Sequence, residues 1–320
     1  MKVVVIPPKQ KNDCIANLFI EGLYDNGVDV FASDFGNGVR DVYSDSEIIE
    51  HSKSADYIFY LWGQRFSGKE YLVKQINRPE ITAYIDGSEW SYMGKPTDPN
   101  QVKERRYRGE PWIHEEMYNY CKWYFKSACY PEDAERGIIP FPVGCINRYF
   151  TMSDSIKDRQ KKWDVFCNFG PDRSASHGPN ARSGLRPEIY EFFNSNRDSI
   201  SCVIGKKEKL EYFETLVQSY IVPSSWGAQF WSMREWEVLA SGSLCFMQRP
   251  LVLYADHKPL DGVHWVEYSD MNEFKEKLDY YLKNKDLCVD IGLAGRKHAL
   301  KYHSSKAKVK YALDIMGSVV

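Results

Sequence analysis

The sequence predicts an α/β fold built from two successive parallel sheets, each covered by helices on both faces. Short uninterrupted apolar runs, typical of strands buried on both sides, alternate with segments whose apolar residues have helical spacing. A polar stretch, residues 151–162, separates two such alternating sets and is the best candidate for a linker. A chain of 320 residues also exceeds one typical core and suggests two domains of roughly 150 residues.

The first set begins with the apolar run 3–6, which predicts a fully buried strand. A helix is expected next at 13–24, with an apolar stripe that includes Leu18 and Phe19, and Asn26-Gly27 ends it. Further strands are expected at 28–31, 57–61 and 81–85, helices at 46–52 and 115–120, and extended segments at 122–130 and 138–143. Residues 93–109 are polar and are interpreted as an inserted loop.

The second set begins with a strand at 163–169 that leads into a loop rich in Gly, Ser, Arg and His. A helix at 187–194 follows, and Pro187 suits its first turn. Strands are then expected at 200–204, 220–222 and 244–247, and helices at 208–219, 271–284 and 287–302. Ligands bind such sheets beyond the carboxyl ends of the strands, so the loops that follow the strands should carry the functional residues.

The segment 232–246 combines a helix with the buried strand that follows it. Ser232 is a plausible N-cap, and Glu235 three residues later completes a capping box. Arg234 and Glu237 are three residues apart and therefore share one helix face. Arginine at a helix start suits a phosphate, and a nearby carboxylate suits sugar hydroxyls. The alternative is an ordinary surface ion pair that contributes little.

The composition favours a soluble globular protein. Hydrophobic residues make up 43% of the chain and charged residues 27%, and the net charge of −2 predicts no general attraction to nucleic acid or to anionic membranes. No apolar run approaches the length of a membrane span, and the N-terminal run is too short for a signal peptide. The eight scattered cysteines form no C-x-x-C pair and predict reduced, buried thiols in a cytoplasmic protein.

Residues 163–312 resemble the C-terminal domain of GT-B glycosyltransferases, and more narrowly the family 1-like group that includes CgeB-type spore-maturation proteins. The spacing Arg234-x-x-Glu237-x-x-Ala240-x-Gly242 is similar to the R-x-x-E-x-x-A-x-G signature of this group. The segments 211–227, 261–268 and 291–303 are similar to other parts of the same domain. Over residues 1–150 the resemblance rests on the fold pattern.

This resemblance implies two Rossmann-like domains facing a cleft. Residues 1–155 would bind the acceptor and residues 156–320 the nucleotide-sugar. Glu237 would then contact ribose or sugar hydroxyls, and Arg234 would contact the diphosphate together with backbone amides. The remaining donor-binding candidates implied are Gly170, Arg173, Trp226, Gly227 and Gly242.

The activity implied is hexosyl or deoxyhexosyl transfer to an acceptor hydroxyl, on a glycan or on a modified nucleobase. The sequence shows neither an Asp-x-Asp motif at a strand end nor a histidine pair at ligand spacing, so we expect no metal and no cofactor beyond the donor substrate. Retaining relatives carry Glu-x7-Glu, and this chain has Gln229 at the first position. Both stereochemical outcomes therefore remain open.

An inverting reaction needs a general base in the acceptor-binding half. Asp86 and Glu89 follow a predicted strand end directly and are the best placed carboxylates, and Asp13 in the first loop comes next. The alternative for each of these residues is a role in a helix cap or a turn.

Two other functions stay open at this point. A nucleotide-sugar epimerase could use the same fold, but it would need several carboxylates and a histidine that converge in one cleft. A nucleic-acid-binding module is suggested by the basic run 103–108 and by an aromatic content of 15%. Such a run is more often a solvated loop in a nearly neutral chain.

Overall fold

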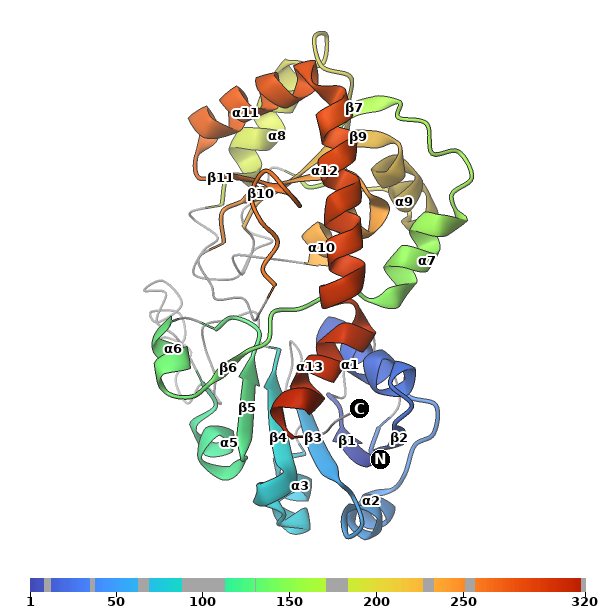
Figure 1. The fold of residues 1–320 in the computed structure, drawn as a ribbon, viewed down its shortest axis with the longest axis vertical. Coiled ribbons are helices and arrows are strands. Elements are labelled where there is room, and N and C mark those ends of the chain that lie inside the picture. The colour runs from blue at the N-terminus through green and yellow to red at the C-terminus, as the bar shows by residue number, and fades with distance from the viewer. Residues whose placement is uncertain are drawn as a thin grey trace. The chain divides into compact units, whose positions relative to one another are not determined.

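The computed structural model describes residues 1–8, 13–34, 38–62, 69–87, 113–129, 131–170, 184–226, 233–250 and 257–317. The chain divides into two compact units (Figure 1). Unit 1 contains Met1–Ile146 and His303–Val320, and unit 2 contains Asn147–Leu251 and His257–Tyr302.

Unit 1 is built on a sheet of six parallel strands in the order β2-β1-β3-β4-β5-β6. The strands are β1 (Lys2–Ile6), β2 (Asp29–Ala32), β3 (Tyr57–Trp62), β4 (Thr82–Asp86), β5 (Trp123–Lys126) and β6 (Ile139–Pro140). The apolar run 3–6 is fully buried in β1, as its sequence predicts.

Several helices of unit 1 begin at a residue whose side chain caps them. The helices of this unit are α1 (Cys14–Asp25), α2 (Asp45–Ser52), α3 (Glu70–Ile76), α5 (Glu115–Tyr120), α6 (Pro131–Glu135) and α13 (Ser305–Ile315). Ser44 and Glu47 form a capping box at the start of α2. Leu18 and Phe19 of α1 are completely buried, which confirms the predicted apolar stripe.

Helix α13 returns to unit 1 from the far end of the sequence. It packs against α1, where Gly22 lies so close to the backbone of Ser305 that no side chain would fit. Cys145 pairs with the same segment, because its N–H donates to the His303 carbonyl oxygen at 2.7 Å and its own carbonyl accepts from Ser305 N at 3.1 Å. The units therefore divide after Ile146, and the end of the chain belongs to unit 1, whereas the sequence suggested one division after residue 155.

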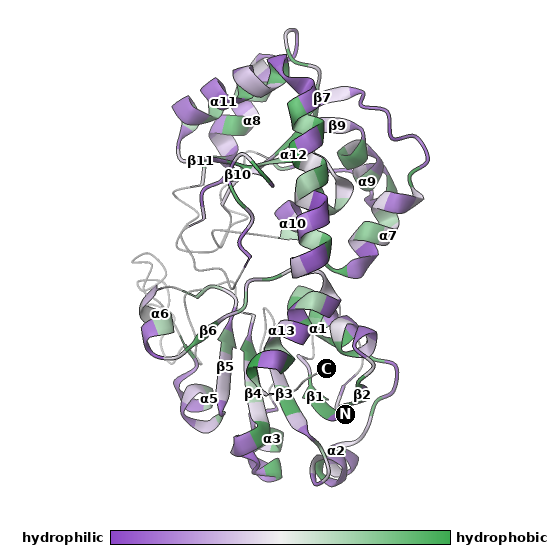
Figure 2. Cartoon of the chain, viewed as in Figure 1, coloured by the Kyte–Doolittle hydropathy of each residue, from purple (hydrophilic) through white to green (hydrophobic). Residues whose placement is uncertain are grey.

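Unit 2 is built on a sheet of five parallel strands in the order β11-β10-β9-β7-β8. The strands are β7 (Trp163–Cys167), β8 (Cys202–Ile204), β9 (Ser219–Ser224), β10 (Leu244–Gln248) and β11 (Val266–Tyr268). The helices are α7 (Asn147–Ser155), α8 (Arg186–Ser195), α9 (Lys209–Val217), α10 (Met233–Ser241), α11 (Met271–Lys283) and α12 (Lys285–His298). Figure 2 shows hydrophilic and hydrophobic residues along α12, which buries Cys288 and Ile291 and exposes Leu293.

The two sheets share one strand order. In each, the first strand in the chain lies between the second and the third, and the later strands follow on one side. This doubly wound order creates a switch point beside the first strand, where ligands bind outside the carboxyl ends of such sheets. The prediction of two Rossmann-like α/β units is confirmed. In unit 2 the switch point lies between β7 and β9.

The segment expected to be a linker is only partly one. Its first residues, up to Ser155, belong to α7, whose Tyr149 and Phe150 are buried. The rest is anchored to unit 2, because the Lys161 ammonium donates to the Ser219 carbonyl at 2.5 Å and to the Ser243 hydroxyl at 2.9 Å. Apolar residues that precede the polar stretch extend the helix into it, which the composition of 151–162 alone does not reveal.

The cysteines behave as the sequence predicts. All eight are free; six are buried, and Cys14 and Cys202 are partly buried. Burial raises the pKa of the Cys167 thiol to about 12, so this group stays protonated at neutral pH. None of the described helices is long and apolar enough to cross a membrane.

Candidate functional site

The carboxyl edge of the sheet in unit 2 gathers polar and aromatic side chains around the switch point. Asn168 and Phe169 directly follow β7, and Trp226 follows β9. Helix α10 comes next in the chain after β9, and its first turn carries Arg234. Because parallel strands end at the same edge, these residues are brought together although they are distant in sequence.

Glu237 is held by hydroxyl groups on neighbouring helices. The Tyr212 hydroxyl on α9 donates to Glu237 Oε2 at 2.6 Å, and Asn168 Nδ2 donates to the Tyr212 oxygen at 2.9 Å. Burial raises the pKa of the Glu237 carboxyl, while the Tyr212 hydrogen bond and the Arg234 charge act in the opposite direction. The result is an enclosed carboxylate beside a cation.

Two arginines lie over one aromatic ring at this edge. The guanidinium carbon of Arg234 is 5.3 Å from the centre of the Phe169 ring, and that of Arg186 is 5.8 Å from it. Arg186 begins α8, and Arg234 lies in the first turn of α10. Guanidinium groups at two helix starts suit a phosphate-bearing ligand. Sequence reasoning missed Arg186, although its place directly before Pro187 marks a helix start.

Gln248 joins three segments of the edge through a single oxygen. Its Oε1 accepts hydrogen bonds from the Ser225 hydroxyl at 2.7 Å, from Trp226 N at 3.2 Å and from Leu185 N at 3.3 Å. The Trp226 indole N–H in turn donates to the Gln248 and Arg249 carbonyl oxygens, each at 3.1 Å. The end of β10 thereby positions the end of β9 and the start of α8.

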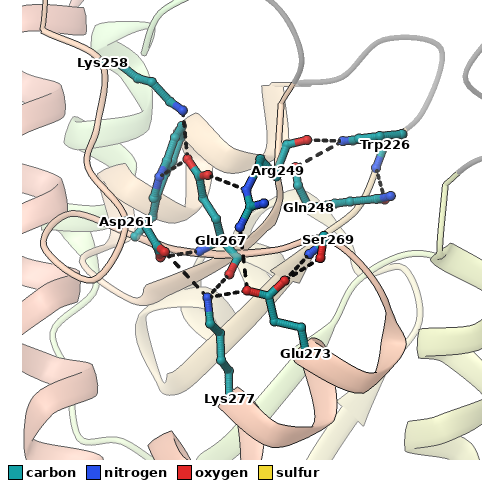
Figure 3. A network of polar contacts seen from close by, with 10 residues as sticks. Trp226, Gln248, Arg249, Lys258, Asp261, Glu267, Ser269, Glu273 and Lys277 are labelled. Atoms are coloured by element: carbon teal, nitrogen blue, oxygen red, sulfur yellow. Dashed lines mark hydrogen bonds and ion pairs between the residues drawn. The ribbon is translucent and has the colours of Figure 1, made fainter.

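A network of opposite charges surrounds the end of β10 (Figure 3). Glu267, nearly buried on β11, pairs with Arg249 at 3.3 Å and with Lys258 at 3.0 Å. Burial raises the pKa of Glu273, but hydrogen bonds from Lys277 and Ser269 outweigh this effect and lower the pKa to about 2. Glu273 therefore stays ionised at neutral pH. Both carboxylates pair with the side chain of Arg249, whose backbone carbonyl accepts the hydrogen bond from the Trp226 indole.

The structure brings Trp226, Arg234 and Glu237 to one edge of unit 2. It places Gly170 shortly after β7, where no atom of the described residues lies within 4 Å of the position that a Cβ would take. Gly242 lies at the opposite end of α10, where its positive φ of 78° ends the helix against α12. Other predicted features lie outside the described residues: Glu89, Arg173, Gly227, Gln229, Ser232 and the run 103–108. Glu235, the proposed partner in the capping box, is fully buried and accepts from the Ser224 hydroxyl at 3.1 Å.

The described acidic candidates of unit 1 have different environments. Asp13 is the N-cap of α1, where its carboxylate accepts from Ala16 N at 2.9 Å. Asp86 is the last residue of β4 and is fully buried, and the Tyr124 hydroxyl donates to its Oδ2 at 2.9 Å. The neighbouring strand carries Lys126, opposite Asp86 in the register.

Lys126 adds a buried cation to this edge of unit 1. Its ammonium pairs with the Asp133 carboxylate on α6 at 2.8 Å, and both side chains are almost completely buried. Buried charges of this kind are costly unless they are paired. Sequence reasoning missed both residues, because neither lies in a recognisable motif. The carboxyl edge of the sheet in unit 1 therefore holds an ion pair next to Asp86.

Comparisons with known proteins show which proteins share this architecture. Residues 186–314 match a family model described as glycosyl transferase-like. A glycosyltransferase from Rickettsia africae is similar in structure, with 11% identity, a TM-score of 0.57 and coverage of 98% of this chain and 97% of that one. No relative was found among curated protein sequences.

Two further solved structures were determined with bound ligands. The Anabaena protein HepE in complex with UDP has 8% identity and a TM-score of 0.58, with both chains fully covered. An alpha-glucosyltransferase in complex with UDP-glucose and DNA containing an abasic site has 12% identity and a TM-score of 0.56, with coverage of 99% of this chain and 100% of that one. At such identities the likeness establishes a shared fold. The predicted resemblance to GT-B glycosyltransferases is confirmed at the level of the fold, and membership of the narrower CgeB-type group stays a prediction.

Proposed function

We propose that this protein transfers a hexosyl or deoxyhexosyl group from a nucleotide-diphospho-sugar to an acceptor hydroxyl. The observation that carries the proposal is the placement of Arg234 and Glu237 on the first turns of α10, beside the switch point of unit 2. A cation for the diphosphate and a carboxylate for hydroxyls are the two groups that such a donor requires. UDP-sugars are the first class to test, because the HepE and alpha-glucosyltransferase structures contain UDP or UDP-glucose.

In the proposed reaction the acceptor oxygen bonds to the anomeric carbon as the bond from that carbon to the β-phosphate oxygen breaks. Negative charge then grows on the departing nucleoside diphosphate. Arg234 and the positive end of the α10 dipole would stabilise this charge, the task that a metal ion performs in other enzymes. We therefore propose a reaction that needs neither a metal nor a cofactor.

The proton of the acceptor hydroxyl must pass to a base. We propose Asp86 for this role, because the carboxylate of Asp13, the other candidate among the described residues, already caps α1. The acceptor itself is proposed only as a class, a hydroxyl on a glycan or on a modified nucleobase. We also propose a cytoplasmic location, because reduced cysteines persist in that compartment.

A melting-temperature screen tests donor binding directly. A nucleotide-sugar that binds only the folded protein stabilises it by about 2.7 kcal/mol at a hundredfold excess over its dissociation constant. For a protein of this size, that corresponds to a rise of several degrees. We expect at least one UDP- or GDP-sugar to produce this rise, with a chelator present as well as without it. A panel that leaves the melting temperature unchanged would contradict the proposal.

Replacing Glu237 with glutamine is expected to lower transfer at least about a hundredfold while the protein remains folded. The amide keeps the size of the side chain, but it loses the negative charge that attracts donor hydroxyls. Initial rates at several donor concentrations measure the effect. Glu208→Gln is a suitable control, because Glu208 precedes α9 in the same unit without a side-chain hydrogen bond to the helix cap. Near-normal turnover in Glu237→Gln would remove this residue from the site.

A further inference from the structure

Tyr212 links β7 to α10 through a directed pair of hydrogen bonds. Its hydroxyl oxygen accepts from Asn168 Nδ2 at 2.9 Å and lies 2.6 Å from Glu237 Oε2. A tyrosine hydroxyl has a single proton. Because the amide of Asn168 already donates to the oxygen, that proton is directed to Glu237, where Oε2 accepts it.

The surroundings favour this arrangement of charges. Burial and the adjacent Glu237 charge raise the pKa of Tyr212 well above its ordinary value, so the hydroxyl remains a donor. Asn168 Oδ1 is buried and accepts no hydrogen bond from the described residues, so this oxygen is an acceptor that a ligand hydroxyl would satisfy.

We propose that Tyr212 is a positioning residue: anchored by Asn168, its hydroxyl keeps Glu237 ionised and oriented to accept hydrogen bonds from hydroxyl groups of the donor. The proposal rests on the proposed function in one respect: the ligand whose hydroxyl groups bind Glu237 is taken to be the sugar donor. The ionisation of Glu237 itself is a property of the free protein and can be measured without a donor.

Other groups that face Glu237 come from α7 and from its own helix. Burial of the carboxyl raises its pKa, and Tyr212 contributes the largest opposing effect. Arg234 on α10, a hydrogen bond from Tyr149 and the charge of Arg148 also lower it. Tyr212 is therefore one of several stabilising groups, and its removal should shift the titration without abolishing it.

The experiment is a titration of Glu237 in the full chain labelled with ¹³C at the glutamate carboxyl carbons. The resonance missing from Glu237→Gln identifies the group. In Tyr212→Phe we expect the midpoint of this resonance to rise by about one to two pH units, because a hydrogen bond to a charged group is lost. Asn168→Ala, which releases the hydroxyl from its anchor, should shift the midpoint in the same direction by a smaller amount.

Tyr120→Phe is the matched control. Its hydroxyl donates to the Val73 carbonyl at 3.1 Å in unit 1, so the variant also loses a tyrosine hydrogen bond, but one far along the chain from Glu237. We expect no change in the Glu237 midpoint. Midpoints that stay at the wild-type value in both Tyr212→Phe and Asn168→Ala would overturn the proposal. If Tyr212→Phe does not fold, the Asn168→Ala titration decides alone.

Donor kinetics provide a second measurement. In Tyr212→Phe the KM for the donor should rise while kcat changes less, and the rise in KM should grow as the pH falls through the Glu237 midpoint, where the carboxylate is lost. A role limited to stability would change KM equally at every pH. If no nucleotide-sugar binds the wild-type protein, the proposed function fails while the titration still decides the role of Tyr212.

Discussion

Replacing Arg234 with alanine is expected to lower sugar transfer by about a hundredfold to a thousandfold. In the proposed reaction this guanidinium stabilises negative charge on the departing diphosphate, and that charge is greatest in the transition state. We therefore expect kcat to fall more than the affinity for the donor. Initial rates at saturating and limiting donor concentrations separate the two effects, and the melting temperature shows whether the variant is folded.

Arg197→Ala is the matched control for this experiment. Arg197 belongs to the same unit, is exposed, and bonds only locally to the Asn194 side chain in the contacts described, at 3.2 Å. Its loss should leave transfer within about twofold of the wild-type rate, as surface substitutions usually do. Arg234→Lys keeps the charge without the planar fork and should retain intermediate activity. An Arg234→Ala protein that transfers sugar at the wild-type rate would show that another group meets the diphosphate.

Asp86→Asn is expected to lower kcat by about a hundredfold to ten-thousandfold, the contribution typical of a general base. The amide oxygen can still accept the hydrogen bond that Tyr124 donates at 2.9 Å, so the local structure should survive. The amide cannot take a proton, and the acid limb of the pH profile of kcat should disappear. Rates across a pH series measure both effects.

Asp13→Asn serves as the comparison. Asparagine caps helices about as well as aspartate, so α1 should form normally and transfer should remain within a fewfold of wild type. The reverse pattern, with Asp13→Asn inactive and Asp86→Asn active, would assign the base to the first loop. Full activity in both variants would exclude the two described acidic candidates of unit 1.

The strands and the main helices could be predicted because their signals are local. Buried parallel strands are continuous apolar runs, as residues 3–6 illustrate. Asp13 is an N-cap residue and marks the start of α1. Helix α13 also has a local signal, since Ser304 caps it, but the last helix expected from the sequence ends at residue 302, so α13 was missed. Its membership of unit 1 depends on contact with Gly22, which no local pattern reveals.

The candidate site could be predicted from the sequence only where a single helix carries its residues. Arg234 and Glu237 share a face of α10, so their spacing was enough to pair them. Tyr212 reaches Glu237 from a different helix, and Asn168 reaches Tyr212 from a strand end, so only the fold shows these contacts. Gly242 belongs to the same sequence signature, yet its positive φ shows that it serves the end of the helix rather than its beginning.

The return of α13 to unit 1 makes that unit discontinuous in the sequence. The ribosome completes all of unit 2 before it makes the helix that packs against α1. During synthesis the surface of α1 beside Gly22 therefore stays uncovered until α13 has been made, although the second unit already has its whole sequence. Separating the protein into independent halves would accordingly require a circularly permuted chain, in which α13 precedes β1, and not a simple cut.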